Sequence, residues 1–128
     1  MSESNKKTVL IVDDSLVVRE MLKSYLKETG FDIIEAQDPK ECLKILSAST
    51  AKINLGLIDV EMPHMNGFEL IEMIRAHPSY ADVPFVMVTS MQDKKHVTQA
   101  VKSGACDYIG KPFNQKTLLD KIHKHLKD

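Results

Sequence analysis

The stretch Thr8-Val-Leu-Ile-Val-Asp-Asp-Ser15 decides the fold class of this chain, because a short apolar run in it ends abruptly in two acids. Residues Thr8–Val12 are apolar or β-branched without interruption, a pattern typical of a strand that is buried on both faces. Ser15 is a good helix N-cap, and apolar side chains such as Val18 and Leu22 follow it at helical spacing. The stretch therefore predicts a buried strand that leads directly into an amphipathic helix.

The same alternation of a short apolar run and a helical pattern continues along the chain. Further strands are predicted at Asp32–Ala36, Asn54–Ile58, Pro84–Val88 and Tyr108–Gly110, and later helices have predicted caps at Asp38, Asp93 and Asn114. Five strands that alternate with five helices predict an α/β fold, a doubly wound parallel sheet with helices on both faces. Right-handed crossovers then bring the carboxyl ends of the strands to one edge, where such sheets bind ligands.

Length and composition are those of one soluble globular domain. The 128 residues are 43% apolar and 27% charged with a formal net charge of −1, so we expect a single domain over residues 1–128 with its core at about 8–126. The absence of a basic excess argues against direct nucleic-acid binding, and the apolar runs are too short for membrane insertion. The first residues lack the apolar segment of a secretory signal, so a cytoplasmic location is expected.

Polar side chains follow the predicted strands where each one ends. Asp13 and Asp14 come after the first strand and Asp59 after the third. Thr89 ends the fourth strand, and Lys111 follows the fifth. Because the carboxyl ends of parallel strands share one edge, we expect three carboxylates, a hydroxyl and an ammonium group to meet there.

Such a cluster suits phosphoryl transfer. Carboxylates held close together repel one another, and a divalent cation that prefers oxygen ligands, Mg²⁺ or Mn²⁺, relieves the repulsion. A carboxylate nucleophile, a cation, a lysine and a hydroxyl are the groups that this chemistry uses. Asp13 and Asp14 alone could simply cap the first helix. The ordered set at successive strand ends favours the functional interpretation.

The sequence resembles the receiver domains of two-component response regulators, from about Thr8 to Leu126. The motifs that carry the resemblance are Val12-Asp13-Asp14-Ser15, Asp59-Val-Glu-Met-Pro-His-Met-Asn-Gly67, Thr89-Ser90 and Lys111-Pro112-Phe113. Each motif is weak alone, but the ordered set is specific. The resemblance implies a flavodoxin-like sheet with strand order 2-1-3-4-5.

The resemblance also implies a role for each residue of the edge cluster. Asp59 would be phosphorylated by a histidine kinase. The cation would be bound by Asp13, Asp14, Asp59 and the backbone carbonyl of Glu61, with Asp13 acting mainly through bound water. Lys111 and Thr89 would each bind a phosphoryl oxygen. The peptide bond before Pro112 would be cis, which orients the lysine.

The resemblance also implies a conformational switch and residues that set how long the phosphoryl group stays on Asp59. Phosphorylation would draw Thr89 inward and turn Tyr108, which changes a protein-binding surface on the fourth helix, fifth strand and fifth helix. Glu61 and Met91 occupy positions that tune loss of the phosphoryl group in this family. Met91 cannot hydrogen-bond an attacking water, so slow-to-moderate self-dephosphorylation is predicted.

Several functions fit a receiver, and two other classes compete with it. The expected partners are a histidine kinase as donor and a downstream protein, such as a motor switch component or a phosphotransfer protein. The stretch Asp13-Asp-Ser-Leu-Val-Val-Arg19 looks chemotaxis-like, and the chain could also be a receiver excised from a larger regulator. A haloacid-dehalogenase-like phosphohydrolase needs Asp-x-Asp after the first strand, which is absent here. The intact Asp59, Thr89 and Lys111 set argues against a scaffold that is never phosphorylated. We expect no enzyme activity beyond self-catalysed phosphorylation and dephosphorylation.

The histidines are interpreted as solvated side chains. His123 and His125 lie two residues apart, a spacing that does not place both on one helix face. The last helix also carries several lysines, which indicates a solvated face or, alternatively, a surface for an acidic partner.

Overall fold

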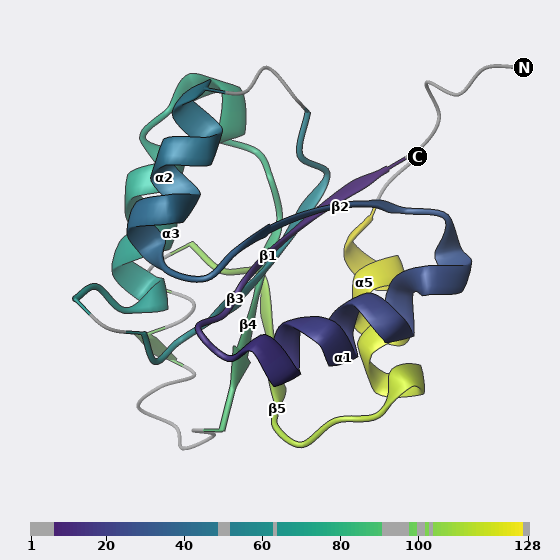
Figure 1. Ribbon diagram of the computed structural model, residues 1–128. Helices are drawn as coiled ribbons and strands as arrows, with labels where there is room; N and C mark the ends of the chain where they lie inside the picture. The colour runs from purple at the N-terminus through teal and green to yellow at the C-terminus, as the bar shows by residue number, and fades with distance from the viewer. Residues whose placement is uncertain are drawn as a thin grey trace, which may run out of the picture.

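A five-stranded parallel sheet forms the centre of the molecule (Figure 1). The computed structural model describes residues 7–48, 52–62, 64–90, 98–99, 102 and 104–126. The strands are β1 (Thr8–Val12), β2 (Asp32–Ala36), β3 (Leu55–Asp59), β4 (Phe85–Thr89) and β5 (Asp107–Gly110). They lie in the order β2-β1-β3-β4-β5, which confirms the predicted doubly wound fold and its strand order.

Helices connect the strands. They are α1 (Leu16–Leu26), α2 (Pro39–Ala48), α3 (Gly67–Arg75) and α5 (Gln115–His125), with short 3₁₀ turns η2 (Lys27–Thr29) and η3 (Pro78–Tyr80). Of the predicted fourth helix, Thr98, Gln99 and Lys102 are described and are helical. Its predicted cap, Asp93, lies outside the described residues.

Side-chain caps start three of these helices as expected. The side chains of Ser15, Asp38 and Asn114 each accept a hydrogen bond from the backbone N–H three residues later, at 3.2, 2.7 and 2.8 Å. A capping box starts α3, in which Asn66 and Glu69 each accept from the backbone N–H of the other. These bonds satisfy donors that have no partner within the helix, so each helix begins at a defined residue after its strand.

Strands β3, β4 and β5 differ by one residue from the prediction. β3 and β4 begin and end one residue later than expected, and β5 begins one residue earlier. Pro84 has no N–H to donate, which delays the start of β4. Asp59 and Thr89 consequently pair within the sheet, opposite Val88 and Gly110 respectively. Both side chains therefore project from strand backbone and not from a loop.

Two apolar layers enclose the sheet. Figure 1 shows α1 and α5 on one face and α2 and α3 on the other. The strand β1 alternates between them: Val9 and Ile11 pack with α1 and α5, and Leu10 and Val12 pack with α2 and α3. All four side chains are fully buried, so packing on both faces holds β1 at the centre of the sheet. In the part of the chain that the structure describes, the helices are too short or too polar to cross a membrane.

Candidate functional site

The carboxyl ends of four strands bring polar side chains to one edge of the sheet. Asp13 and Asp14 directly follow β1, and Asp59 is the last residue of β3. Thr89 is the last residue of β4, and Lys111 directly follows β5. Because β3 lies between β1 and β4, Asp59 takes the central place in this group.

Three carboxylates meet in this group. Asp13, Asp14 and Asp59 each offer an oxygen, and these oxygens all lie within 4.8 Å of one another. Asp13 and Asp59 are buried, with 1% and 4% of their surface exposed, whereas Asp14 is exposed. The backbone N–H of Ser15 donates to Asp13 Oδ1 at 2.9 Å, and that of Glu61 donates to Asp59 Oδ1 at 3.4 Å. The site therefore has a buried floor and one side open to solvent.

Lys111 supplies the positive charge of the site. Its Nζ lies 3.2 Å from Asp13 Oδ2 and 3.4 Å from Asp59 Oδ1. Its backbone N–H donates to the Thr89 carbonyl at 2.8 Å, and the peptide bond to Pro112 is cis. Burial disfavours the ammonium charge, but attraction to Asp59 and then Asp13 outweighs burial, so the pKa of Lys111 is raised.

One lysine does not balance the two buried acids. The pKa of Asp59 is raised to about 6, first by burial and then by the negative charge of Asp13, against the opposing effect of Lys111. The all-oxygen donor set and this uncompensated negative charge suit a hard divalent cation such as Mg²⁺. The residues present thus fit the cation that the sequence implies.

Three other predicted residues lie on or next to strands β3, β4 and β5. Thr89 is buried, 3% exposed, at the end of β4. Glu61 is exposed next to the site, where its Oε1 accepts from Ser90 Oγ at 3.4 Å. Tyr108 is half-buried on β5, with its ring centroid 5.5 Å from Lys121 Nζ.

The predicted dephosphorylation residue Met91 lies outside the described residues.

A contact that the sequence did not indicate holds the acidic loop. Arg19 Nη1 donates to the Asp13 backbone carbonyl at 2.7 Å, and Arg19 Nε donates to Glu35 Oε1 at 3.0 Å. The five-residue spacing between Asp14 and Arg19 is visible in the sequence, but the partner on β2 is not.

The interpretation of His125 as a solvated side chain is wrong. Its Nε2 lies 2.9 Å from Asp107 Oδ2, and its side chain is only 18% exposed. Lys121 Nζ also lies 2.8 Å from Asp107 Oδ1. Burial would raise the pKa of Asp107, but hydrogen bonds from Lys121 and His125 outweigh it and lower the pKa to about 2. The side chains of Lys121 and His125 thus join α5 to the start of β5.

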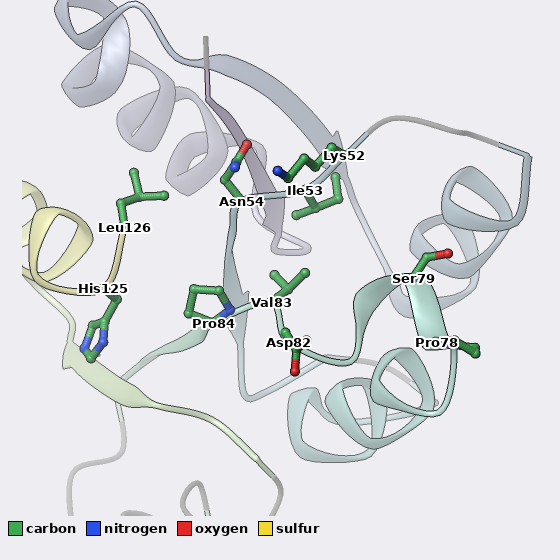
Figure 2. Close-up of a pocket in the computed structure, with 10 residues that line it drawn as sticks. All are labelled: Lys52, Ile53, Asn54, Pro78, Ser79, Asp82, Val83, Pro84, His125 and Leu126. Carbon is green, nitrogen blue, oxygen red and sulfur yellow. The ribbon is translucent and has the colours of Figure 1, made fainter. Parts of the chain in front are cut away.

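A hollow of about 460 Å³ lies at a different edge of the molecule. Figure 2 shows Asn54 and Pro84, which directly precede β3 and β4, on one part of its wall and His125 at the end of α5 on another. These residues mark the amino ends of the strands. The hollow therefore lies at the edge of the sheet opposite the acidic group.

Comparisons with known proteins agree with this geometry. The chain matches the response regulator receiver domain family over residues 9–123. It is 36% identical to a chemotaxis protein CheY homolog of Campylobacter jejuni subsp. jejuni over 115 residues, 89% of this chain and 88% of the relative. It is 34% identical to the transcriptional regulatory protein GltR of Pseudomonas aeruginosa, over 93% of this chain and 48% of that relative.

A solved structure shows the same likeness in three dimensions. The chemotaxis protein CheY4 of Vibrio cholerae superposes with a TM-score of 0.87 at 32% identity, covering 94% of this chain and 99% of that one. The chain belongs to the response regulator receiver domain family, as a CheY-like receiver of two-component signalling.

Proposed function

We propose that this receiver accepts a phosphoryl group on Asp59 from the phosphohistidine of a histidine kinase, in a reaction that depends on Mg²⁺. The observation that carries the proposal is the setting of Asp59. Its carboxylate is buried at the end of β3, lies 3.4 Å from Lys111 Nζ, and has the oxygens of Asp13 and Asp14 within 4.8 Å. Carboxylates serve as phosphoryl acceptors where positive charge is held beside them.

The proposed cation ligands are chiefly the carboxylates whose negative charge Lys111 only partly compensates. Asp14 and Asp59 would bind it directly, together with the backbone carbonyl of Glu61, and Asp13 would bind it through water. When bound, Mg²⁺, or Mn²⁺ in its place, supplies positive charge that neutralises the oxygens of the incoming phosphoryl group. The exposure of Asp14 leaves one side of the site open for the donor.

The transfer exchanges one bond to phosphorus for another. An Asp59 carboxylate oxygen bonds to phosphorus while the phosphorus–nitrogen bond of the phosphohistidine breaks, and the electron pair of that bond returns to the imidazole. Lys111 binds one phosphoryl oxygen, and the Thr89 hydroxyl binds another. In this scheme the chain turns over no separate substrate and catalyses only its own phosphorylation and dephosphorylation.

Phosphorylation would change a surface made by the fourth helix, β5 and α5. Thr89 is buried at the end of β4, which pairs with β5, and the half-buried Tyr108 lies on β5. A movement of Thr89 could therefore be transmitted to Tyr108 through these paired strands. The phosphoryl group shifts the two conformations only by its differential interaction with them. A shift from 1:99 to 99:1 requires about 5.5 kcal/mol.

Glu61 and Met91 are proposed to set how long Asp59 stays phosphorylated. Glu61 is exposed two residues after the acceptor, and its Oε1 accepts a hydrogen bond from Ser90 Oγ at 3.4 Å. We expect slow-to-moderate self-dephosphorylation. Rapid loss of label that stays unchanged in Glu61→Asn and in Met91 variants contradicts this assignment.

The downstream partner is proposed to be a protein. Relatives named as chemotaxis proteins favour a motor switch component, and a phosphotransfer protein is the second candidate. We propose that this receiver acts as a single domain in the cytoplasm, where it would bind the kinase and its downstream partner. Binding of a purified candidate before and after phosphorylation distinguishes the two, because only the intended partner changes its affinity.

One experiment tests the acceptor directly. The protein is incubated with a small phosphodonor such as acetyl phosphate and MgCl₂, and the intact mass is measured over time. We expect a gain of one phosphoryl group that disappears in EDTA and in Asp59→Asn. Asp82→Asn, at an exposed carboxylate on the opposite edge, should be labelled like the wild type. No gain with any donor and either cation, Mg²⁺ or Mn²⁺, refutes the proposal.

A further inference from the structure

Arg19 joins the acidic loop to the neighbouring strand. Its side chain is 11% exposed on α1. One end of its guanidinium donates to the Asp13 carbonyl at 2.7 Å, and Nε donates to Glu35 Oε1 on β2 at 3.0 Å. The planar, rigid fork of an arginine holds two acceptors at a fixed separation, which a flexible lysine cannot do.

The main chain of Asp13 is held on both sides. Its N–H donates to the Ala36 carbonyl of β2 at 3.2 Å, and its C=O accepts from Arg19. Because a peptide unit is planar, a fixed Asp13 carbonyl also fixes the N–H of Asp14. Arg19 thus holds this peptide unit from a side chain of the helix that follows it.

Asp14 depends on this peptide unit for its position. It is exposed, yet one of its carboxylate oxygens lies within 4.8 Å of those of Asp13 and Asp59. We infer that Arg19, oriented by Glu35, is a positioning residue that holds the Asp13–Asp14 peptide unit in place for divalent cation binding. This inference rests on the proposed function, since it concerns the same cation site.

Glu35 is well suited to orient Arg19. Its pKa is lowered, chiefly by the hydrogen bond from Lys23 and also by that from Arg19, so it stays ionised at neutral pH. Lys23 Nζ lies 2.7 Å from Glu35 Oε2. Lys23 is a matched control, because it is a second cation on α1 that pairs with the same carboxylate, and its other ion pair is with Glu20.

The sign of the effect separates positioning from charge. Arg19 is a cation near a cation site, so removing its charge should tighten Mg²⁺ binding if only electrostatics matter. If Arg19 acts by position, removing it should weaken binding, because groups that orient metal ligands typically change affinity by about 10- to 100-fold. Arg19→Lys keeps the charge and loses the fork, so electrostatics alone predicts no change for that variant.

The test is a titration of MgCl₂ into the full chain at constant ionic strength, followed by backbone amide NMR, with no phosphodonor present. We expect Arg19→Gln and Arg19→Lys to raise the Kd for Mg²⁺ about tenfold. We expect Lys23→Gln to change it by less than about twofold. In the metal-free proteins, the Asp13 carbonyl carbon and Asp14 amide resonances should shift in the two Arg19 variants and stay in place in Lys23→Gln.

Each other outcome has a definite meaning. If the wild type binds Mg²⁺ and the Arg19 variants bind it as tightly or more tightly, the inference is overturned and the proposed function stands. Equal weakening in all three variants overturns the specific role of Arg19, because the effect would then come through Glu35 alone. If the wild type does not bind Mg²⁺, the proposed cation site fails and the inference fails with it. Arg19→Lys keeps the test decisive if Arg19→Gln does not fold, as circular dichroism will show.

Discussion

Replacing Asp59 by Asn removes the proposed phosphoryl acceptor, yet we expect the metal-free variant to be more stable than the wild type at neutral pH. The reason is the charge of the site. Ionised Asp59 is buried beside ionised Asp13, and Lys111 compensates only part of the repulsion. An amide of nearly the same shape has no charge to bury.

The size of the effect follows from the pKa. The pKa of Asp59 is raised from 3.8 to about 6. Each pKa unit corresponds to about 1.4 kcal/mol, so the ionised side chain destabilises the folded state by at most about 3 kcal/mol. The open side of the site at Asp14 admits solvent, which reduces this figure. We expect Asp59→Asn to raise the free energy of unfolding by about 2 kcal/mol.

The sign can be checked by pH. Above pH 6, Asp59 is ionised in both the folded and unfolded states, so the full destabilisation is present. As the pH falls through 6 toward 3.8, the folded state takes up its proton first and the wild type gains stability relative to the variant. The difference should fall to about half near pH 5. Added MgCl₂ should reverse the order at neutral pH, because only the wild type binds it well, and 100 times the Kd contributes about 2.7 kcal/mol.

Urea unfolding in EDTA, followed by circular dichroism at pH 7.5 and pH 5, measures these differences. Asp82→Asn is the control, since Asp82 is exposed on the opposite edge, and it should match the wild type at both pH values. An Asp59→Asn protein that is equal to or less stable than the wild type at pH 7.5 in EDTA would refute the charge argument.

Two further predictions concern the framework of the site. Gly67→Ala should lower the free energy of unfolding by about 1 to 2 kcal/mol in urea melts and should slow phosphorylation. The reason is that a Cβ at Gly67 would collide with the Asp59 carbonyl oxygen. This overpacking outweighs the better helix propensity of alanine. Asp107→Asn should lower the free energy of unfolding by about 1 to 2 kcal/mol at neutral pH, since Asp107 pairs with Lys121 and His125. The pKa of Asp107 is lowered to about 2, so its stabilising effect is present above pH 4 and is lost as the pH falls toward 2.

Matched variants accompany both predictions. Leu16→Ala, at the exposed first residue of α1, controls for alanine at the start of a helix and should stay within about 0.5 kcal/mol of the wild type. Asp120→Asn, which breaks an exposed pair with Lys116 on α5, should do the same. A Gly67→Ala protein as stable as the wild type, or an Asp107→Asn difference that persists at pH 2, contradicts the corresponding argument.

The sheet and the central residues of the site could be predicted from sequence because their signals are local. Thr8–Val12 and Asp32–Ala36 match the predicted strands, and the caps at Ser15 and Asn114 start helices as expected. Parallel topology then brings the strand ends together whatever the details of packing. This is why Asp59 could be placed beside Asp13 without coordinates.

The contacts that could not be predicted join elements distant in the sequence. Arg19 and Glu35 belong to α1 and β2, and each looks like an ordinary exposed charge in its own amphipathic pattern. His125 meets Asp107 across 18 residues, although histidine spacing gave no sign of a partner. Long charged side chains extend from one secondary-structure element to another. Their partners therefore depend on side-chain rotamers and on depth of burial, which hydrophobic periodicity does not encode.

The central claim is that Asp59, and no neighbouring carboxylate, carries the phosphoryl group. Borohydride reduces an acyl phosphate to an alcohol, so a phosphorylated aspartate becomes homoserine, which peptide mass spectrometry can locate. After treatment with acetyl phosphate, MgCl₂ and borohydride, homoserine is predicted at position 59 alone. Homoserine at position 13 or 14, or no homoserine in a protein that has gained the mass of a phosphoryl group, would contradict the account.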